Sequence, residues 1–228
     1  MKKVTYNELE EKIGYKFKDK NNLVIAFTHK SFTNEKMCGN RECYERFEFL
    51  GDAILEYLVS EFLFTEYPDK PEGELTKFRA SLVCEFTLSK ISRELGLGSY
   101  GFFSKGELNT GGPNRDSILC DMFESLLGAL YIDGGIDVAK NFVKKFLLTD
   151  IEHKKLFYDS KSKLQEYVQK KNITMTYEVI KESGPDHNKE YVVQVLFGDE
   201  KMAEGNGHSR KAAEQMAAFN TLKSLENG

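Results

Sequence analysis

The sequence predicts a mainly α protein, in which an all-α domain is followed by a small α-β-β-β-α domain. Three observations support this prediction. The first two thirds of the 228 residues show apolar residues at helical spacing and no convincing period-two alternation. Residues 175–197 then alternate and are rich in the β-branched and aromatic residues that strands prefer. An alanine-rich helical segment closes the chain, which gives the last part the order of an α+β domain.

In the first domain, placed at residues 1–150, apolar periodicity and helix stop signals define the elements. The third predicted helix ends before Pro68, the fourth at Gly96 and the fifth before a Gly-Gly pair, as is common at helix C-termini. The predicted helices cover residues 6–13, 21–27, 41–65, 76–95, 115–132 and 137–148. Residues 99–114 are polar and rich in glycine, which predicts a long loop, and such loops often have a function.

The second domain is placed at residues 160–228. It follows a charged stretch without clear periodicity, at residues 151–159, that we interpret as a linker. Two helices are predicted to enclose three strands, which is a common arrangement for a domain of this size. The predicted segments are helix 162–171, strands 175–183, 189–197 and 201–207, and helix 208–225.

Composition and charge limit the classes of protein to which the chain can belong. Nothing is apolar and long enough to span a membrane, and the N-terminus lacks the apolar core of a secretory signal, so cytoplasmic residence is expected. The net charge of −4 is a weak argument against a nucleic-acid partner, which usually binds a basic surface. The cysteines form no C-x-x-C pair, and free thiols are expected. They are Cys38, Cys43, Cys84 and Cys120.

A stripe of acidic residues dominates the third predicted helix. Residues three or four apart share one face of a helix, and four acids have this spacing. They are Glu45, Glu48, Asp52 and Glu56. A solvated face is the plainer interpretation, but no basic residue lies between these acids on that face of the helix, so they repel one another mildly unless a cation is held there. Gly51 costs the helix about 1 kcal/mol relative to alanine, which suggests that another group approaches closely.

A second acid pair interrupts the fifth predicted helix, which is apolar nearly all round and is expected to be buried. Asp121 and Glu124 share one face with Ser117, Ser125 and Gly128. Burying an unpaired carboxylate costs several kcal/mol or forces it to take up a proton. A salt bridge, a shared proton or a metal ion would each remove this cost. The bases considered for a salt bridge are Arg46, Lys77 and Arg79.

The two acid pairs together favour a metal ion. Four carboxylates from two helices form an all-oxygen set of ligands, which suits hard cations such as Mg²⁺ or Mn²⁺ and disfavours zinc. Such a site can activate a water molecule and stabilise charge on a phosphate, as phosphodiester hydrolysis requires. The sequence contains no convincing catalytic triad, and no small-molecule cofactor is expected.

The start of the last predicted helix is a candidate phosphate site. Ser209, Arg210 and Lys211 lie there. A helix N-terminus presents free N–H groups and a positive dipole, and the two basic side chains add charge at the same place. A capped helix with two exposed basic residues is the plainer alternative. The overall charge is a poor guide, because basic residues cluster on the two helices of this module.

Several sequence blocks resemble those of the ribonuclease III family, in the same order. Residues 45–52 (ERFEFLGD) resemble the family signature, and residues 160–225 resemble a double-stranded RNA-binding domain. Three further blocks are 27–32 (FTHKSF), 78–83 (FRASLV) and 121–129 (DMFESLLGA). The resemblance covers nearly the whole chain and implies a ribonuclease III endonuclease and dimerisation domain followed by the RNA-binding domain. Departures from the family pattern, none of which removes a carboxylate, are Phe47, Ala53, Cys120 and Ser125.

The resemblance also implies roles for individual residues. The metal-binding and catalytic carboxylates would be Glu48, Asp52, Asp121 and Glu124. Asp52 and Glu124 would anchor the principal Mg²⁺, with Mn²⁺ as an alternative, and Asp121 would hold and activate a water molecule. The family acts as a homodimer, in which Phe49 would insert into the partner subunit and Glu45 would support the subunit interface.

The implied substrate is double-stranded RNA. The products would carry 5′-phosphate and 3′-hydroxyl ends with short 3′ overhangs, and rRNA and mRNA precursors would be the targets. Gln165 and His187 would contact the minor groove, which recognises the shape of A-form RNA. Ser209, Arg210 and Lys211 would contact phosphates. Two other interpretations stay open: a non-catalytic double-stranded RNA-binding protein, and a metal phosphohydrolase for small nucleotides, which would not need the C-terminal module.

Overall fold

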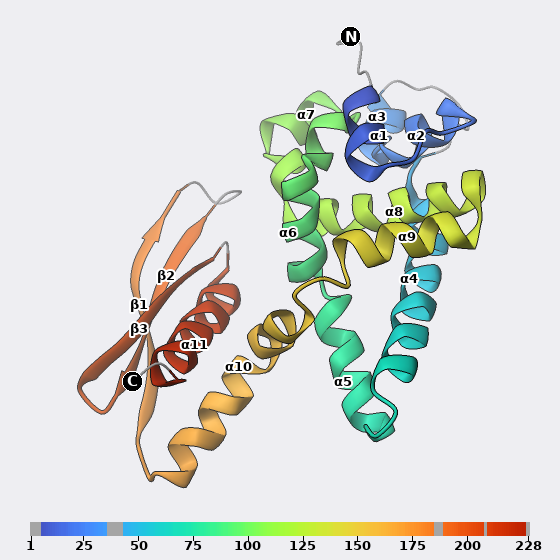
Figure 1. The fold of residues 1–228 in the computed structure, drawn as a ribbon. Helices are drawn as coiled ribbons and strands as arrows, with labels where there is room; N and C mark the ends of the chain where they lie inside the picture. Colours follow the sequence, from blue (N-terminus) through green and yellow to red (C-terminus); the bar gives the residue numbers. More distant parts are fainter. Residues whose placement is uncertain (1–5, 36–42, 185–188, 208, 227–228) are drawn as a thin grey trace. The chain divides into compact units, whose positions relative to one another are not determined.

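The structure is a computed structural model of the chain, and it describes residues 6–35, 43–184, 189–207 and 209–226. It divides into two compact units, Met1–Ile151 and Glu152–Gly228 (Figure 1). Within the described ranges, the first unit is helical apart from an isolated bridge between two residues, and the second has a three-stranded sheet with two helices. The predicted order of an all-α part and an α-β-β-β-α part is therefore confirmed.

Most helices of the first unit agree with the predicted ranges to within a few residues at their ends. They are α1 (Asn7–Ile13), α2 (Lys20–Ala26), α4 (Glu45–Glu66), α8 (Asp116–Gly134) and α9 (Ile136–Phe146). Residues 41 and 42, predicted as the start of α4, lie outside the described residues. The short helix α3 (Lys30–Glu35) escapes prediction, because six residues are too few to show a periodic pattern.

The prediction of a single helix at residues 76–95 is wrong. The structure has two helices there, α5 (Glu72–Leu82) and α6 (Glu85–Leu95), joined through an extended residue. Thr87 Oγ1 donates a hydrogen bond to the carbonyl oxygen of Ser81 at 3.0 Å, close to the break. This side-chain bond satisfies a carbonyl group that the end of α5 leaves open, so the chain can break the helix without a glycine or a proline.

The prediction that residues 99–114 form a long loop is only partly correct. Three short helical elements lie within this segment or overlap it. They are η1 (Leu97–Tyr100), α7 (Lys105–Asn109) and η2 (Gly112–Asn114). The side chain of Ser104 begins α7 by accepting a hydrogen bond from the backbone N–H of Glu107 at 3.1 Å. Such capping side chains stabilise a short helix in a stretch whose composition predicts irregular structure.

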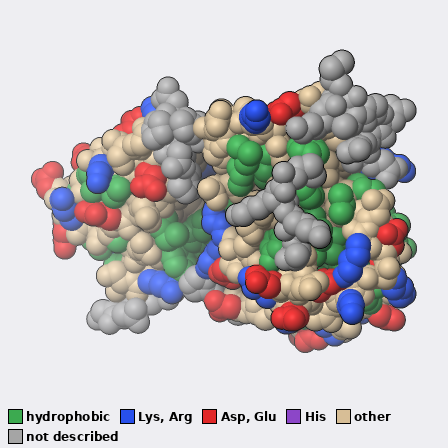
Figure 2. All heavy atoms as spheres, turned by 90° about the horizontal axis from the view of Figure 1, so that it is seen from above, with side chains coloured by type: hydrophobic (Ala, Val, Ile, Leu, Met, Phe, Trp, Pro, Cys, Tyr) green, Lys and Arg blue, Asp and Glu red, His purple; other side chains and the backbone are tan. Residues whose placement is uncertain are grey.

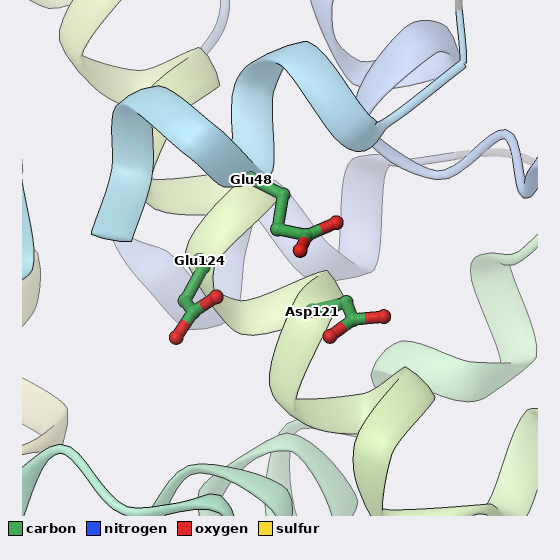
Figure 3. A group of neighbouring side chains, drawn as sticks. All are labelled: Glu48, Asp121 and Glu124. Atoms are coloured by element: carbon green, nitrogen blue, oxygen red, sulfur yellow. The ribbon is translucent and has the colours of Figure 1, made fainter. Parts of the chain in front are cut away.

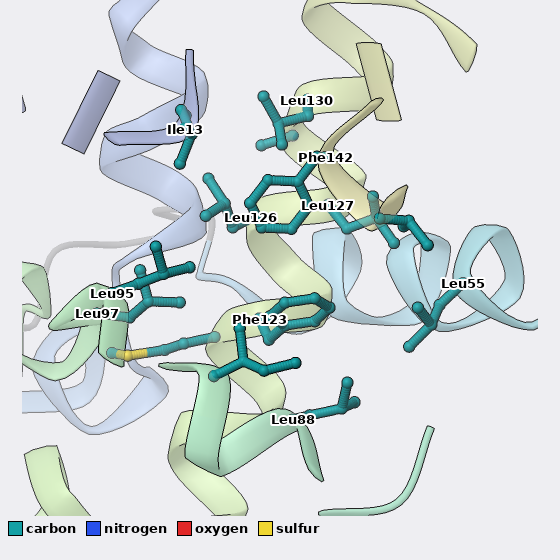
Figure 4. Packing of buried hydrophobic residues seen from close by; sticks show 14 of the residues in the cluster. Ile13, Leu55, Leu88, Leu95, Leu97, Phe123, Leu126, Leu127, Leu130 and Phe142 are labelled. Atoms are coloured by element: carbon teal, nitrogen blue, oxygen red, sulfur yellow. The ribbon is translucent and has the colours of Figure 1, made fainter. Parts of the chain in front are cut away.

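The core of the first unit forms around α8, the helix that the sequence predicts to be buried. Its apolar side chains pack with residues of α1, α4, α6 and α9, and burying a side chain of this size contributes about 1.5–3 kcal/mol. Figure 4 shows α8 side chains among these neighbours, including Phe123, Leu126, Leu127 and Leu130. Because α8 is held on several sides, the polar side chains that it carries are held in position as well.

Helices α4 and α8 cross with their backbones in direct contact at two glycines. A Cβ atom at Gly51 would lie 1.8 Å from the carbonyl oxygen of Glu124, and one at Gly128 would lie 2.2 Å from that of Phe47. Real Cβ atoms do not approach so closely, so only glycine permits this crossing. The close approach that Gly51 suggests in the sequence is therefore confirmed, and the approaching group is the backbone of α8.

The second unit packs an antiparallel sheet against helices. The strands, in the order β1-β2-β3, and the helices are β1 (Met175–Ser183), β2 (Glu190–Phe197), β3 (Glu200–Gly207), α10 (Ile151–Lys170) and α11 (Arg210–Glu226). Leu164 of α10 and Val193 and Val195 of β2 are fully buried with small residues of α11. Residues 151–159, interpreted from the sequence as a linker, are helical and belong to α10.

The surface carries charges of both signs. Figure 2 shows acidic and basic side chains interspersed on one face of the molecule. The net charge of −4 is therefore not gathered into one patch on this face. In the described part of the chain, no helix has the length and apolar character needed to cross a membrane.

Replacing Gly51 with alanine should destabilise the first unit. The added methyl group overlaps the backbone of α8, and overpacking of this kind costs about 1–3 kcal/mol or more. Urea denaturation followed by circular dichroism measures the loss. Gly73→Ala is the matched control, because a Cβ atom there meets nothing within 4 Å and alanine suits a helix. Equal stability of Gly51→Ala and the wild type would contradict the importance of the crossing.

Candidate metal centre

Three carboxylates from two crossing helices meet at one place. Glu48 lies on α4, and Asp121 and Glu124 lie about one turn apart on α8 (Figure 3). One carboxylate oxygen of each residue lies within 4.8 Å of the others, close enough for small side-chain rotations to bring all three onto one cation. In the part of the chain that the structure describes, this is the one group of acidic, histidine or cysteine side chains with such a spacing.

The crossing of α4 and α8 holds this arrangement. Glu48 lies about one turn before Gly51, so its side chain shares the face of α4 that touches α8. The carbonyl oxygen of Glu124 is the atom that Gly51 faces, so the turn of α8 that carries this acid is held against α4. Backbone packing therefore places the acids, whose own interactions are repulsive.

The three carboxylates repel one another and are partly removed from water. Burial, and next the charge of Asp52, raises the pKa of Glu124 to about 8. Burial, and next the charge of Asp121, raises the pKa of Glu48 to about 7. Burial also raises the pKa of Asp121, against the lowering effect of a hydrogen bond from Tyr44. The positive charge of Lys30 lowers the pKa of Glu48 and of Asp121, yet both stay raised. A divalent cation would supply further positive charge, so these residues fit such an ion.

Two hydrogen-bond donors hold the acids of α8. The hydroxyl group of Tyr44 donates to Asp121 Oδ2 at 2.9 Å, and the thiol of Cys120 donates to Glu124 Oε1 at 3.8 Å. Burial raises the pKa of both donors above their usual range, so both keep their protons. Tyr44 is not predicted as a site residue, although its position directly before the acid helix is a signal that it lies nearby.

Asp52, the fourth predicted carboxylate, lies outside the group of three. Its side chain is exposed, about one turn along α4 from Glu48. Its charge nevertheless reaches the group, because it contributes to the raised pKa of Glu124 and of Glu48. Asp52 is therefore a neighbour of the three-carboxylate group, and its side chain has to turn toward a cation in order to bind it.

The two ends of the acid stripe have basic partners. Glu45 pairs with Lys30 at 3.0 Å, and Glu56 pairs with Arg79 at 2.6 Å. The bases that pair with the ends of the stripe come from other helices, α3 and α5, and not from the face of α4 that carries the acids. Arg79, one of the bases considered as a partner for the second acid pair, pairs with the acid stripe instead.

Phe49 lies beside Glu48 in the sequence but points to solvent. It is 81% exposed, more than any other large apolar side chain among the described residues. An aromatic ring of this size gains free energy when another surface covers it. The structure thus leaves Phe49 available for a contact outside the chain, next to the three-carboxylate group.

The predicted RNA-contact residues that the structure describes lie on α10 and at the start of α11. Ser209 Oγ accepts a hydrogen bond from the backbone N–H of Ala212 at 3.1 Å, which caps α11. Arg210 pairs with Glu214 at 2.9 Å. The predicted contacts that are exposed include Gln165, Ser209, Arg210 and Lys211, and His187 lies outside the described residues.

Known proteins resemble both units. A family model described as Ribonuclease-III-like matches residues 19–151, and one described as Double-stranded RNA binding motif matches residues 160–225. Ribonuclease 3 of Bacillus cereus is 42% identical over 224 residues, which are 97% of this chain and 91% of that protein. Ribonuclease 3 of Bacillus anthracis is 43% identical over 220 residues, 95% of this chain and 90% of the relative. The nuclease domain of ribonuclease III from Campylobacter jejuni has a TM-score of 0.59 and 40% identity, over 63% of this chain and 96% of that structure.

A helical domain with a carboxylate cluster, joined to a double-stranded RNA-binding domain, defines a nuclease for double-stranded RNA. The sequence matches extend over both domains and nearly the full chain. The chain belongs to the ribonuclease III family and is an endoribonuclease of that type. Membership of this family decides against the two alternatives, a non-catalytic RNA-binding protein and a hydrolase for small nucleotides.

Without metal, the thermal stability of the wild type should fall as the pH rises from about 4.5 to about 8. In this window the folded state keeps a proton on Glu124 that the unfolded state has lost, so rising pH favours unfolding. Glu124→Gln removes the contribution of this carboxylate, while that of Glu48, whose pKa is raised to about 7, remains. In a chelating buffer at about pH 8, the melting temperature of the variant should be higher than that of the wild type. Each kcal/mol of stability corresponds to a shift on the order of 2–4 °C. At about pH 5 the difference in melting temperature should be smaller. The same difference at both pH values would exclude this carboxylate as the cause.

Proposed function

We propose that four carboxylates form the catalytic metal centre of this ribonuclease. They are Glu48, Asp52, Asp121 and Glu124. The observation that carries the proposal is the spacing of three of them within 4.8 Å on two packed helices. All-oxygen ligand sets select hard cations, so Mg²⁺ is the proposed cofactor, with Mn²⁺ as the alternative.

The carboxylates have different tasks in hydrolysis. A divalent cation, when bound, stabilises negative charge on the phosphate and makes a nearby water molecule a stronger nucleophile. Glu124 and Asp52 hold the cation, and Asp121 orients the attacking water and accepts its proton. Attack of water on phosphorus with departure of the 3′ oxygen leaves a 5′-phosphate and a 3′-hydroxyl end.

The proposed active form is a homodimer. Phe49 lies beside Glu48 and is 81% exposed, so a second copy that covers it would stand next to the active site. Glu45, the first residue of α4, supports the same interface. Two active sites each cut one strand of a duplex, and a constant offset between the cuts leaves short 3′ overhangs. In its relative from Campylobacter jejuni, a region of the nuclease domain is described as involved in dimer formation.

The C-terminal unit is proposed to bind the RNA duplex. Gln165 on α10 and His187 contact the minor groove. Ser209, Arg210 and Lys211, at the start of α11, contact phosphates, for which a helix N-terminus and two cationic side chains are suited. Such contacts recognise the shape of A-form RNA, and precursors of rRNA and mRNA in the cytoplasm are the proposed substrates.

Glu124→Gln should abolish cleavage while duplex RNA binding persists. The amide keeps the size of the side chain but supplies no negative ligand, and losing several kcal/mol of charge stabilisation lowers kcat on the order of 10³-fold. Cleavage of a labelled duplex with Mg²⁺ measures kcat, and a mobility-shift assay measures binding.

Glu94→Gln is the control for this experiment. It removes the same charge from an exposed position on α6 and should cleave like the wild type. Full activity of Glu124→Gln would rule out the metal assignment, whereas loss of RNA binding would point to damage beyond the metal centre.

Phe49→Asp should convert the dimer into a monomer. A charged group in place of the ring cannot be buried in an apolar interface without a cost of several kcal/mol. Light scattering coupled to size-exclusion chromatography measures the mass. Leu108→Asp, at a 52% exposed position on α7, is the control and should leave the dimer intact. A Phe49→Asp protein that stays dimeric at low concentration would refute this interface.

A further inference from the structure

Tyr44 connects the segment before α4 to the carboxylate group. Its side chain is 3% exposed, and its hydroxyl group donates to Asp121 Oδ2 at 2.9 Å. Tyr44 directly precedes the first turn of α4, yet its side chain makes no capping hydrogen bond to that helix. The hydroxyl group of Tyr44 therefore donates to an acid on α8, 77 residues away in the sequence, and does not cap the helix that Tyr44 precedes.

Two other contacts hold Tyr44 itself. Its backbone N–H donates to the carbonyl oxygen of Thr28 at 2.9 Å, and its ring meets the ring of His29 edge-on, with centroids 5.5 Å apart. His29 is in turn held by a hydrogen bond between its Nδ1 and Ser31 Oγ at 2.7 Å. A third part of the chain, besides α4 and α8, thus takes part in placing the acids.

We propose that Tyr44 is a positioning residue that sets the orientation of the Asp121 carboxylate toward the cation and the attacking water. This inference rests on the metal centre proposed above. The last torsion of an aspartate side chain has only broad preferences of its own, so a donor that holds one oxygen decides how the carboxylate is turned. Hydrogen bonds to ionised oxygens are among the strong ones, and partners of metal-binding side chains commonly contribute about 10–100-fold to affinity or activity.

Glu124 has a weaker donor than Asp121. The Cys120 sulfur lies 3.8 Å from Glu124 Oε1, and a thiol is a poor hydrogen-bond donor. The two acids of α8 are therefore held unequally: Asp121 is held by a strong donor, while Glu124 can adjust to a ligand. This difference suits the proposed tasks, since orientation matters most for the group that takes a proton from the attacking water.

Tyr44→Phe tests this role, because it removes one oxygen atom and keeps the ring beside His29. Tyr6→Phe is the matched control. Tyr6 is 8% exposed, and its hydroxyl group has no hydrogen-bond partner in the described part of the chain. Each full-length protein is measured for kcat and KM on a duplex RNA, and for the Mg²⁺ concentration that half-maximally raises the melting temperature without RNA.

For Tyr44→Phe we expect kcat to fall about 10-fold or more and the half-maximal Mg²⁺ concentration to rise about 10-fold. KM should stay within about 2-fold, and Tyr6→Phe should match the wild type. A kcat within about 2-fold of the wild type would overturn the role, whatever the melting temperature, and so would a loss that Tyr6→Phe shares. A wild-type protein with neither cleavage nor a Mg²⁺-dependent rise in melting temperature would instead refute the metal centre, and with it the role of Tyr44.

Discussion

Direct backbone contact between α4 and α8 is the constraint on which the site depends. Carboxylates that repel one another do not assemble by themselves, so other contacts have to hold them together. Gly51 and Gly128 allow these contacts, because the absence of Cβ atoms lets each helix touch the backbone of the other. The apolar side chains around α8 contribute the free energy that keeps the crossing closed while the acids oppose it.

The carboxylate group therefore lowers the stability of the fold, and it does so at the site proposed to bind the metal ion. Burial and like charges raise the pKa of Glu48 to about 7 and that of Glu124 to about 8, so ionising either one costs the folded state free energy. A divalent cation reverses the sign of this interaction, since each ionised carboxylate then has a partner. The same packing that makes three like charges unfavourable at this place makes the group suited to a cation.

The features that the sequence predicts correctly depend on spacing along one helix. The burial of α8 and the shared face of its two acids follow from the helical repeat. The close approach at Gly51 follows from the cost of a glycine inside a helix. Pairing between helices does not follow from it: Glu56 meets Arg79 only because α4 and α5 are neighbours. Helical periodicity does not predict the break between α5 and α6, because the side chain of Thr87 replaces a backbone hydrogen bond there.

The block at residues 27–32 resembles the family yet contributes no acid, and its contacts explain what it does. The carbonyl oxygen of Thr28 accepts the backbone N–H of Tyr44, and the N–H of His29 donates to Phe102 at 3.0 Å. Just before the block, the carbonyl oxygen of Ala26 accepts a hydrogen bond from Ser125, the residue after Glu124 on α8. The backbone of this part of the chain therefore connects both acid-bearing helices with segment 99–114, and it helps to hold the geometry of a site that it does not enter.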